Sequence, residues 1–237
     1  MAEIKKSGHT GEEKKVRHGS LYNGWHHFLT ITHHKMLVMR FCFQVGLYRQ
    51  GLLHDLSKYS PEEFRTGIRY YQGFKSPNSA ERDEIGYSAA WLHHKGRNKH
   101  HFEYWIDIRG KGDPTLVGMP MPKRYVVEMF CDRIAACKVY LKEKYTDRSP
   151  LEYYQKNIHM VTMHPDTRVL LVRMLTMLAE KGEKETFRTV KKKIVQSKKK
   201  NARVVSPADG STVKINFSRR TCLFLGWIAI YCKYYKF

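Results

Sequence analysis

The sequence predicts an all-α fold, and three observations support that expectation. Apolar residues recur at helical spacing through residues 25–47, 122–145 and 166–182. No pair of alternating strands is found before residue 200. The chain has 237 residues, of which 42% are hydrophobic, so it is long enough to bury a full core as one domain.

The first half of the domain is expected to contain three helices. Residues 25–47 form a long apolar helix, and Gly46 and Gly51 bracket a turn after it. The segment SPEE starting at Ser60 is typical of a helix start, with serine as the N-cap and proline at the first position, and this helix should end near residue 72. A third helix is expected from about residue 79 to the C-capping Gly96.

The second half begins with a segment, FEYWIDI, that suits either a short strand or a helical turn. Residues 109–121 hold five glycines or prolines and are expected to form a loop. Helices should then follow over 122–145, from Pro150 to Lys156, and from a capping Asp166 to Gly182.

Charge divides the chain into regions. The net charge is +21, and residues 181–237 contribute 15 Lys/Arg against 3 Asp/Glu. We therefore expect a disordered segment over 1–20, a helical domain over 21–187 and a basic, partly apolar extension over 188–237. The basic tail could bind nucleic acid non-specifically or lie on an anionic surface, and its apolar end after Cys222 could instead dock on the domain.

The location of the protein is expected to be cytoplasmic. Its five cysteines form no CxxC pair, which favours a reducing compartment. The first 20 residues lack the apolar stretch of a secretory signal. The longest apolar run, residues 222–232, is far shorter than the roughly 20 residues of a membrane span.

The stretch GLLHDLSKYS, residues 51–60, is the most informative for function. His54 and Asp55 follow an apolar run, and Lys58 lies one helical turn further on. Imidazole and carboxylate together suit a divalent cation such as Zn, Fe, Mn or Co. Adjacent residues diverge by about 100° on a helix, so both can serve one ion only at a turn or a helix end.

Further ligand types surround this stretch. Nine of the thirteen histidines lie between residues 26 and 101. Among them are His34, which competes with its neighbour His33, and the adjacent pairs 93–94 and 100–101. His26 and His27 are expected to be structural or to support a ligand without binding the metal. Asp132 lies mid-helix among apolar residues, where an uncompensated carboxylate is costly, so a metal or a neighbouring cation (Arg133 or Lys138) should neutralise it.

Glu128 lies one turn before Asp132, on the same helix face. It could orient a ligand histidine or pair with Arg124.

This order of residues resembles the HD-domain superfamily of metal-dependent phosphohydrolases. The matching positions are His34, His54, Asp55 and Asp132. Lys58 matches the lysine of the superfamily motif, although Ser57 replaces its glycine. The resemblance implies an HD-domain-like helical bundle with a metal site between helices.

The extra histidines are similar to the added ligands of members that hold two metals, with one histidine recruited from each adjacent pair and Asp55 as the bridge. The implied cofactor is one or two divalent ions, chosen from Mn, Fe, Zn, Co and Mg. The expected metal ligands are His34, His54, Asp55, His93, His94, His101 and Asp132, with His100 as the alternative to His101.

A closer resemblance, over residues 19–187, is to uncharacterised HD-like proteins of bacteria and phages. It rests on the blocks GLLHDLSKYSPEEF, AWLHHKGRNKHHFEYWID and MPKRYVVEMFCDRIAA. This resemblance implies no particular reaction.

The leading functional expectation is hydrolysis of a phosphate ester, in a phosphorylated small molecule or a nucleotide. Asp55 and Lys58 are the expected catalytic residues, and the basic groups expected to bind the phosphoryl group are Lys58, Arg97, Lys99 and Arg133. Two alternatives stay open: an HD-fold di-iron oxygenase or oxidase, and a non-catalytic, metal-stabilised domain whose tail binds nucleic acid.

Overall fold

The computed structural model of the chain describes residues 19–196. The chain divides into two units, residues 1–200 and 201–237, and every described residue belongs to the first. The expectations for residues 1–18 and for the tail beyond residue 196 lie outside the described residues.

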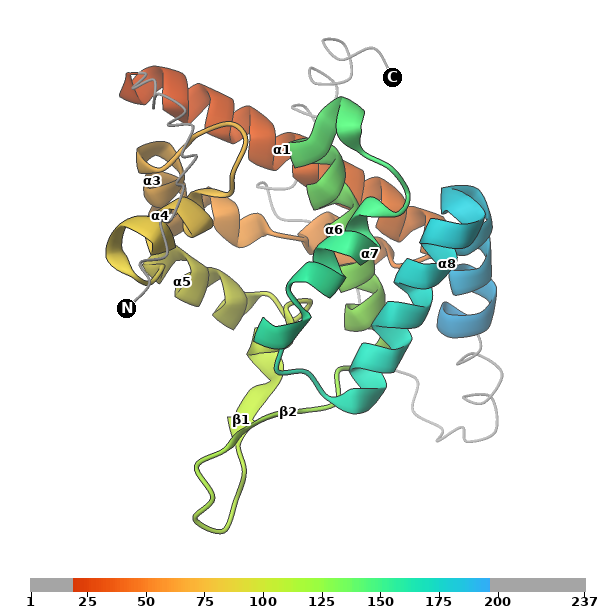
Figure 1. The fold of residues 1–237 in the computed structure, drawn as a ribbon. Helices are drawn as coiled ribbons and strands as arrows, with labels where there is room; N and C mark the ends of the chain where they lie inside the picture. The colour runs from red at the N-terminus through yellow and green to blue at the C-terminus, as the bar shows by residue number, and fades with distance from the viewer. Residues whose placement is uncertain (1–18, 197–237) are drawn as a thin grey trace, which may run out of the picture. The chain divides into compact units, whose positions relative to one another are not determined.

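The described part is a helical domain, as expected, with one small hairpin (Figure 1). Its helices are α1 Ser20–Val45, α2 Tyr48–Leu53, α3 Pro61–Arg69, α4 Pro77–Ile85, α5 Ala89–Arg97, α6 Lys123–Leu141, α7 Ser149–Lys156 and α8 Pro165–Thr189. Short helical turns are η1 Leu56–Tyr59, η2 Phe102–Trp105, η3 Lys142–Lys144, η4 Ile158–Met160 and the π-helical η5 Val190–Val195.

The apolar core joins the C-terminal half of α1 to α6, α8 and η5. Val38, Phe130 and Leu175 are among its fully buried residues. Phe187 stacks on Phe41 with ring centroids 5.2 Å apart, so the end of α8 packs directly on α1. Burial of these apolar side chains stabilises the packing of these helices, some of which also carry the polar site next to the core.

The start of α3 follows the sequence expectation. Ser60 accepts a hydrogen bond from the Glu63 amide at 3.4 Å, and Pro61 is the first helical residue. The helix ends at Arg69, three residues earlier than expected. The Glu63 carboxylate faces α5, which positions it for a role in the site described below.

The single helix expected from residue 79 to Gly96 is wrong. Gly86 takes a left-handed conformation with φ 85° and ends α4, and Ser88 then caps α5 by accepting from the Trp91 amide. Gly96 therefore lies inside α5, whose C-cap is Asn98. The break turns α5 back across α3, so that its histidines face the interior.

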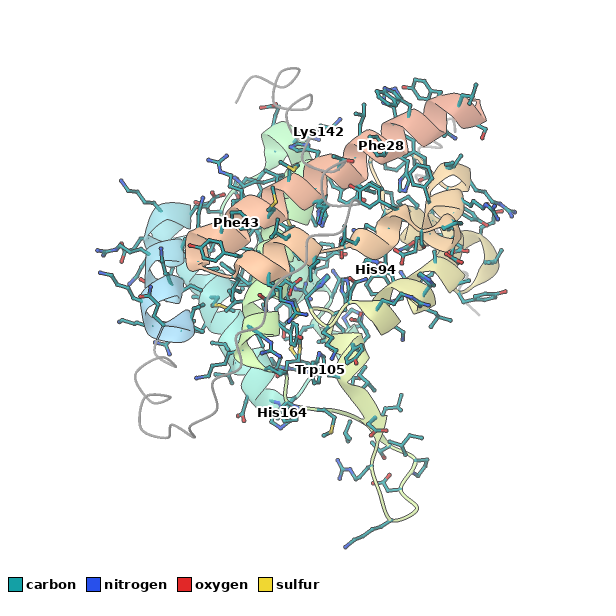
Figure 2. All side chains as sticks on the ribbon, turned by 180° about the vertical axis from the view of Figure 1, so that it is seen from behind. Phe28, Phe43, His94, Trp105, Lys142 and His164 are labelled. Carbon is teal, nitrogen blue, oxygen red and sulfur yellow. The ribbon has the colours of Figure 1, made fainter. Side chains whose placement is uncertain are left out.

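Two smaller differences concern the second half. The segment FEYWIDI is both alternatives in succession, a helical turn η2 and then the strand β1, Ile106–Ile108. Its partner β2, Leu116–Gly118, lies within the expected loop and pairs with β1 in antiparallel register. In Figure 2 the hairpin extends beyond Trp105, away from the helices.

Helix α8 continues past Gly182, where it was expected to end. Gly182 has φ 74° and ψ 172°, which marks a kink, and helical geometry then resumes to Thr189. Val190 after it is fully buried in the core, so the packed domain reaches beyond residue 187.

The close packing of α1 on α3 depends on a glycine. A Cβ at Gly67 would lie 2.0 Å from His27 Nε2, so only glycine allows the imidazole this close. His27 is buried and packs on Phe64. Its role is structural, as expected.

Among residues 19–196, no helix is long and apolar enough to cross a membrane. The described cysteines Cys42, Cys131 and Cys137 are all free thiols.

Candidate metal centre

The stretch around His54 and Asp55 forms a sharp turn between two short helices. His54 ends α2, and Asp55 precedes η1 with φ 52°, a left-handed conformation that is uncommon outside glycine. Because the chain turns here, the two adjacent side chains are able to face one point. This is the geometry that two consecutive ligands require.

A first group of ligand atoms gathers at one oxygen of Asp55. His34 comes from α1 and Asp132 from α6, and both belong to this group with His54 and Asp55. His34 Nε2 lies 3.5 Å from Asp55 Oδ2 and 3.0 Å from Asp132 Oδ1, and His54 Nε2 lies 3.3 Å and 3.6 Å from the same two oxygens. Ligands about 2.1 Å from a shared ion lie roughly 3 to 3.5 Å from each other.

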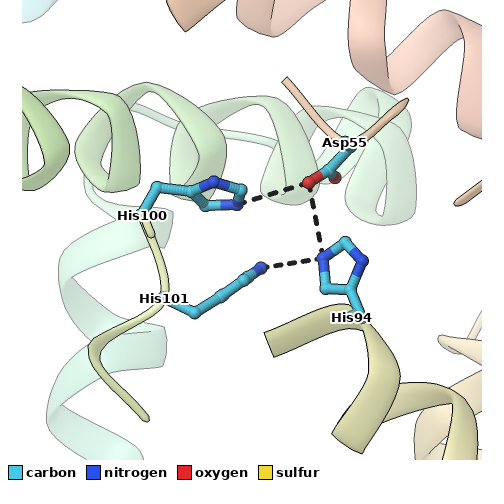
Figure 3. A group of neighbouring side chains, drawn as sticks. All are labelled: Asp55, His94, His100 and His101. Carbon is cyan, nitrogen blue, oxygen red and sulfur yellow. Dashed lines mark hydrogen bonds and ion pairs between the residues drawn. The ribbon is translucent and has the colours of Figure 1, made fainter. Parts of the chain in front are cut away.

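A second group gathers at the other oxygen of Asp55 (Figure 3). Asp55 Oδ1 lies 3.3 Å from His94 Nε2 and 3.3 Å from His100 Nε2. His101 Nε2 lies 2.9 Å from His94 Nε2, which completes a set of three imidazoles and one carboxylate. The Asp55 carboxylate therefore lies between two separate sets of ligands.

The ligand atoms fit a metal because the protein leaves them otherwise unsatisfied. Within residues 19–196, no hydrogen bond satisfies Asp55 Oδ1 or the Nε2 atoms of His34, His54 and His100, although all four atoms are buried. Buried polar atoms without partners are rare in proteins and costly. Divalent cations at the two positions would satisfy them all.

Two glutamates contact the Nδ1 side of the histidine rings and so orient the Nε2 atoms toward the ligand groups. Glu128 Oε1 lies 3.1 Å from His54 Nδ1 and 3.4 Å from His100 Nδ1. Glu63 Oε2 lies 2.8 Å from His94 Nδ1. A histidine that donates its Nδ1 hydrogen to a carboxylate presents a free Nε2 lone pair, the usual arrangement around protein-bound metals.

The electrostatics of the site favour a cation. Burial raises the pKa of the Asp55 carboxyl, but His54 and Lys58 outweigh this effect and hold the pKa well below its usual range. Burial opposes ionisation of Asp132 as well, but the neighbouring His34 and His54 outweigh it and hold the pKa of Asp132 well below its usual range. Both carboxylates are therefore ionised in a buried place, where a divalent cation would neutralise their charge.

The histidines differ in their protonation. Burial lowers the pKa of His54, but Asp55 and Asp132 more than offset it and raise the pKa well above 6.5. His101 is the opposite case, because burial and the neighbouring His100 and His94 hold its pKa well below the usual range. His101 is thus neutral, with a lone pair available to a metal.

Lysine 35 fixes the turn that presents Asp55. Its side chain is 1% exposed, and its Nζ donates hydrogen bonds to the backbone carbonyls of Leu52 at 2.8 Å and His54 at 2.7 Å. The residue next to His34 on α1 therefore ties this helix to the His54–Asp55 turn. Burial lowers the pKa of Lys35 to about 8.

The structure shows which residues of the two adjacent histidine pairs belong to the ligand groups. His93 lies outside both groups, because it faces Glu63 Oε1 at 2.7 Å and Glu62 on α3. His100, which the sequence offered only as an alternative to His101, is in the second group together with it. Residues 98–101 form a turn rather than a helix, so both side chains are able to face inward.

Of the basic candidates for substrate binding, Lys58 is at the site. Its Nζ lies 2.6 Å from Asp55 Oδ2, and its side chain is 26% exposed. Asp132, at 16% exposure, is the other partly open side chain of this group. Solvent therefore reaches the first group along the edge formed by Lys58 and Asp132.

The remaining basic candidates make contacts elsewhere, as their partners show. Arg97 Nη1 donates to the His93 carbonyl, the Lys99 ammonium lies over the Tyr104 ring, and the Arg133 guanidinium lies over the Tyr154 ring.

The sequence patterns do not predict the supporting roles of Glu63 and Lys35. A lysine directly after a ligand histidine within an apolar helix has to bury its ammonium group. Because a buried ammonium group needs partners, such a position indicates a supporting role.

Comparison with known proteins adds a family but no activity. Neither the curated proteins nor the solved structures gave a match to the chain. Residues 23–177 match the model described as "Family of unknown function (DUF5662)", and this range contains every residue of both ligand groups. The chain therefore belongs to the family of unknown function DUF5662.

Proposed function

We propose that this protein is a two-metal hydrolase of phosphate esters. The observation that supports the proposal most directly is the Asp55 carboxylate, which turns one oxygen toward each of two buried ligand groups. Such a bridging carboxylate would hold two divalent ions close together. When bound, two such ions supply an activated water molecule and an electrophilic clamp for phosphoryl oxygens.

The chain's own residues would divide the remaining work. Asp55 would set the spacing of the ions, and the histidines would hold them at the inner side. Lys58, at the open edge, is placed to contact a phosphoryl oxygen and to neutralise its developing negative charge. Of the four basic residues expected to bind the substrate, Lys58 is thus the one that we retain in this role.

An HD-fold di-iron oxygenase or oxidase is the second candidate, and one observation is compatible with it. The second group has three imidazoles and one shared carboxylate, a set that suits iron as well as zinc, cobalt or nickel. The ligands alone do not choose between the two reactions. The basic Lys58 at the open edge favours the hydrolase, because it matches an anionic substrate.

The test begins with elemental analysis of protein purified without oxygen. The protein is then reloaded with the metal found and assayed against a panel of phosphomonoesters, phosphodiesters and nucleotides. We expect two ions per chain and a phosphatase activity that Asp55→Asn abolishes. Two irons, no phosphatase activity and an absorption change on adding oxygen would favour the oxygenase instead.

A further inference from the structure

We infer that Glu128 is a second bridge between the two metal sites, acting behind the histidines as Asp55 acts in front of them. The inference rests on the metal centre of the proposed function. It assigns Glu128 as a positioning residue for both ions at once, and Glu63 as a positioning residue for one.

The geometry of Glu128 distinguishes it from an ordinary buried ion pair. A single oxygen, Oε1, lies 3.1 Å from His54 Nδ1 and 3.4 Å from His100 Nδ1. The two rings are tilted against each other with centroids 4.3 Å apart. His54 belongs to the first ligand group and His100 to the second, so this oxygen contacts one ligand of each.

These contacts close a ring of interactions. Starting from Asp55, the ring passes through His54 to Glu128 and returns through His100 to the other oxygen of Asp55. His54 Nδ1 is hydrogen-bonded to Glu128 and His100 Nδ1 contacts the same oxygen, so both rings turn their Nε2 atoms toward Asp55. The shared carboxylate thus sets the tautomer and the direction of a ligand in each site.

Burial makes this arrangement stable. The Glu128 side chain is 7% exposed, and a carboxylate there has to be compensated. The imidazoles of His54 and His100 supply this compensation, so Glu128 is a shared acceptor for both.

Glu63 offers a matched comparison, because it is a buried glutamate with a similar task on one side only. Its Oε2 contacts Nδ1 of the ligand His94, and its Oε1 contacts His93, which is not a ligand. Both contacts lie on the side of the second group. Loss of its charge should therefore weaken the second site alone.

The test measures each site separately by titrating the chelator-treated, full-length protein with Co²⁺. His94→Gln provides a background in which only the first site binds, and His34→Gln provides one in which only the second site binds. Glu128→Gln, which keeps an acceptor oxygen but removes the charge, is added to each background, and so is Glu63→Gln. Calorimetry gives the Kd, and the visible absorption of bound Co²⁺ reports its coordination.

We expect Glu128→Gln to raise the Kd in both backgrounds by about 10- to 100-fold. Glu63→Gln should raise it only in the His34→Gln background. A Glu128→Gln effect confined to one background, or an equal effect of Glu63→Gln in both, would overturn the inference.

Two further outcomes keep the inference separate from the proposed function. If the unmutated protein binds no Co²⁺, the metal centre and the proposed function fail together. If it binds three ions, the His54–His100–Glu128 group is itself a metal site and the bridging role is wrong. Should Glu128→Gln fail to fold by circular dichroism, Glu128→Asp, whose shorter carboxylate cannot reach both rings, is titrated and judged in the same way.

Discussion

The ammonium group of Lys35 donates a hydrogen bond to the backbone carbonyl of His54 at 2.7 Å, and so ties α1 to the turn that presents Asp55. A second hydrogen bond reaches Leu52, the residue two positions earlier. One buried side chain thus fixes both the helix that carries His34 and the turn that carries His54 and Asp55.

Replacing Lys35 by methionine should weaken metal binding without removing a ligand. The two carbonyls would lose their charged donor, and the cost in the free energy of unfolding should be about 2–4 kcal/mol. Asp55 would also lose the support of its left-handed conformation, so metal content should fall. Thermal unfolding and elemental analysis check both effects, with the exposed Lys156→Met as control. Full metal content in Lys35→Met would show that the turn keeps its conformation without the hydrogen bonds of Lys35.

The adjacent histidines 93 and 94 allow a comparison with the same substitution one residue apart. His94→Gln removes a ligand of the second group, so the metal content should drop from two ions to one per chain. His93→Gln removes contacts with Glu62 and Glu63 but no member of a ligand group, and should keep two ions. Equal losses in the two variants would contradict the orientation that α5 gives these side chains.

Lys58 and Arg97 are both basic residues expected from the sequence to bind phosphate, yet they differ in position. Lys58→Met should lower kcat/KM for a phosphomonoester by about 100-fold, because a charged contact made in the transition state contributes roughly 3 kcal/mol. Arg97→Met should change it less than about threefold, since Arg97 is exposed and faces the His93 carbonyl. Steady-state kinetics of the metal-reloaded variants measures both losses. A larger loss of kcat/KM in Arg97→Met than in Lys58→Met would place the substrate on the α5 side.

The buried His27 should make the fold sensitive to acid. Its pKa is lowered to about 4 by burial and, to a smaller extent, by Lys58. In the unfolded chain the pKa is about 6.5, so between pH 6.5 and 4 the unfolded state binds a proton that the folded state does not. His27 should therefore cost up to about 3 kcal/mol of stability as the pH falls through this range.

Urea unfolding of the full chain at pH 7 and pH 4.5 tests this effect. His27→Asn removes the titrating group, so the loss of stability on acidification should be smaller in the variant than in the unmutated protein. The comparison is between the two pH slopes, because the variant also loses packing on Phe64 and starts from a lower stability. Identical slopes would show that His27 is not the acid-sensitive group.

The sequence was sufficient for most of the helices and for the first ligand group. Ser60 and Pro61 have local capping chemistry, so the start of α3 followed from neighbouring residues alone. His34, His54, Asp55 and Asp132 were recognised through a resemblance to a known ligand order, and the structure brings all four together. Whether that order also means HD-type chemistry stays a prediction.

Other features depended on tertiary structure that the sequence does not display. Gly86 ends a helix, whereas Gly96 lies inside one, although glycine has the same intrinsic preference at both positions. His93 and His94 are chemically identical, and only the direction of α5 decides which faces Asp55. His100 and His101 both reach the second group because residues 98–101 leave the helix, which their composition does not indicate.

The most direct test of the two-metal centre is a crystal structure of the protein soaked in Mn²⁺, with data collected at a wavelength where manganese scatters anomalously. The account predicts two anomalous peaks, one beside each oxygen of Asp55. The first should be coordinated by His34, His54 and Asp132, and the second by His94, His100 and His101. Ordered side chains at these positions with no anomalous peak between them, or peaks only elsewhere, would contradict it.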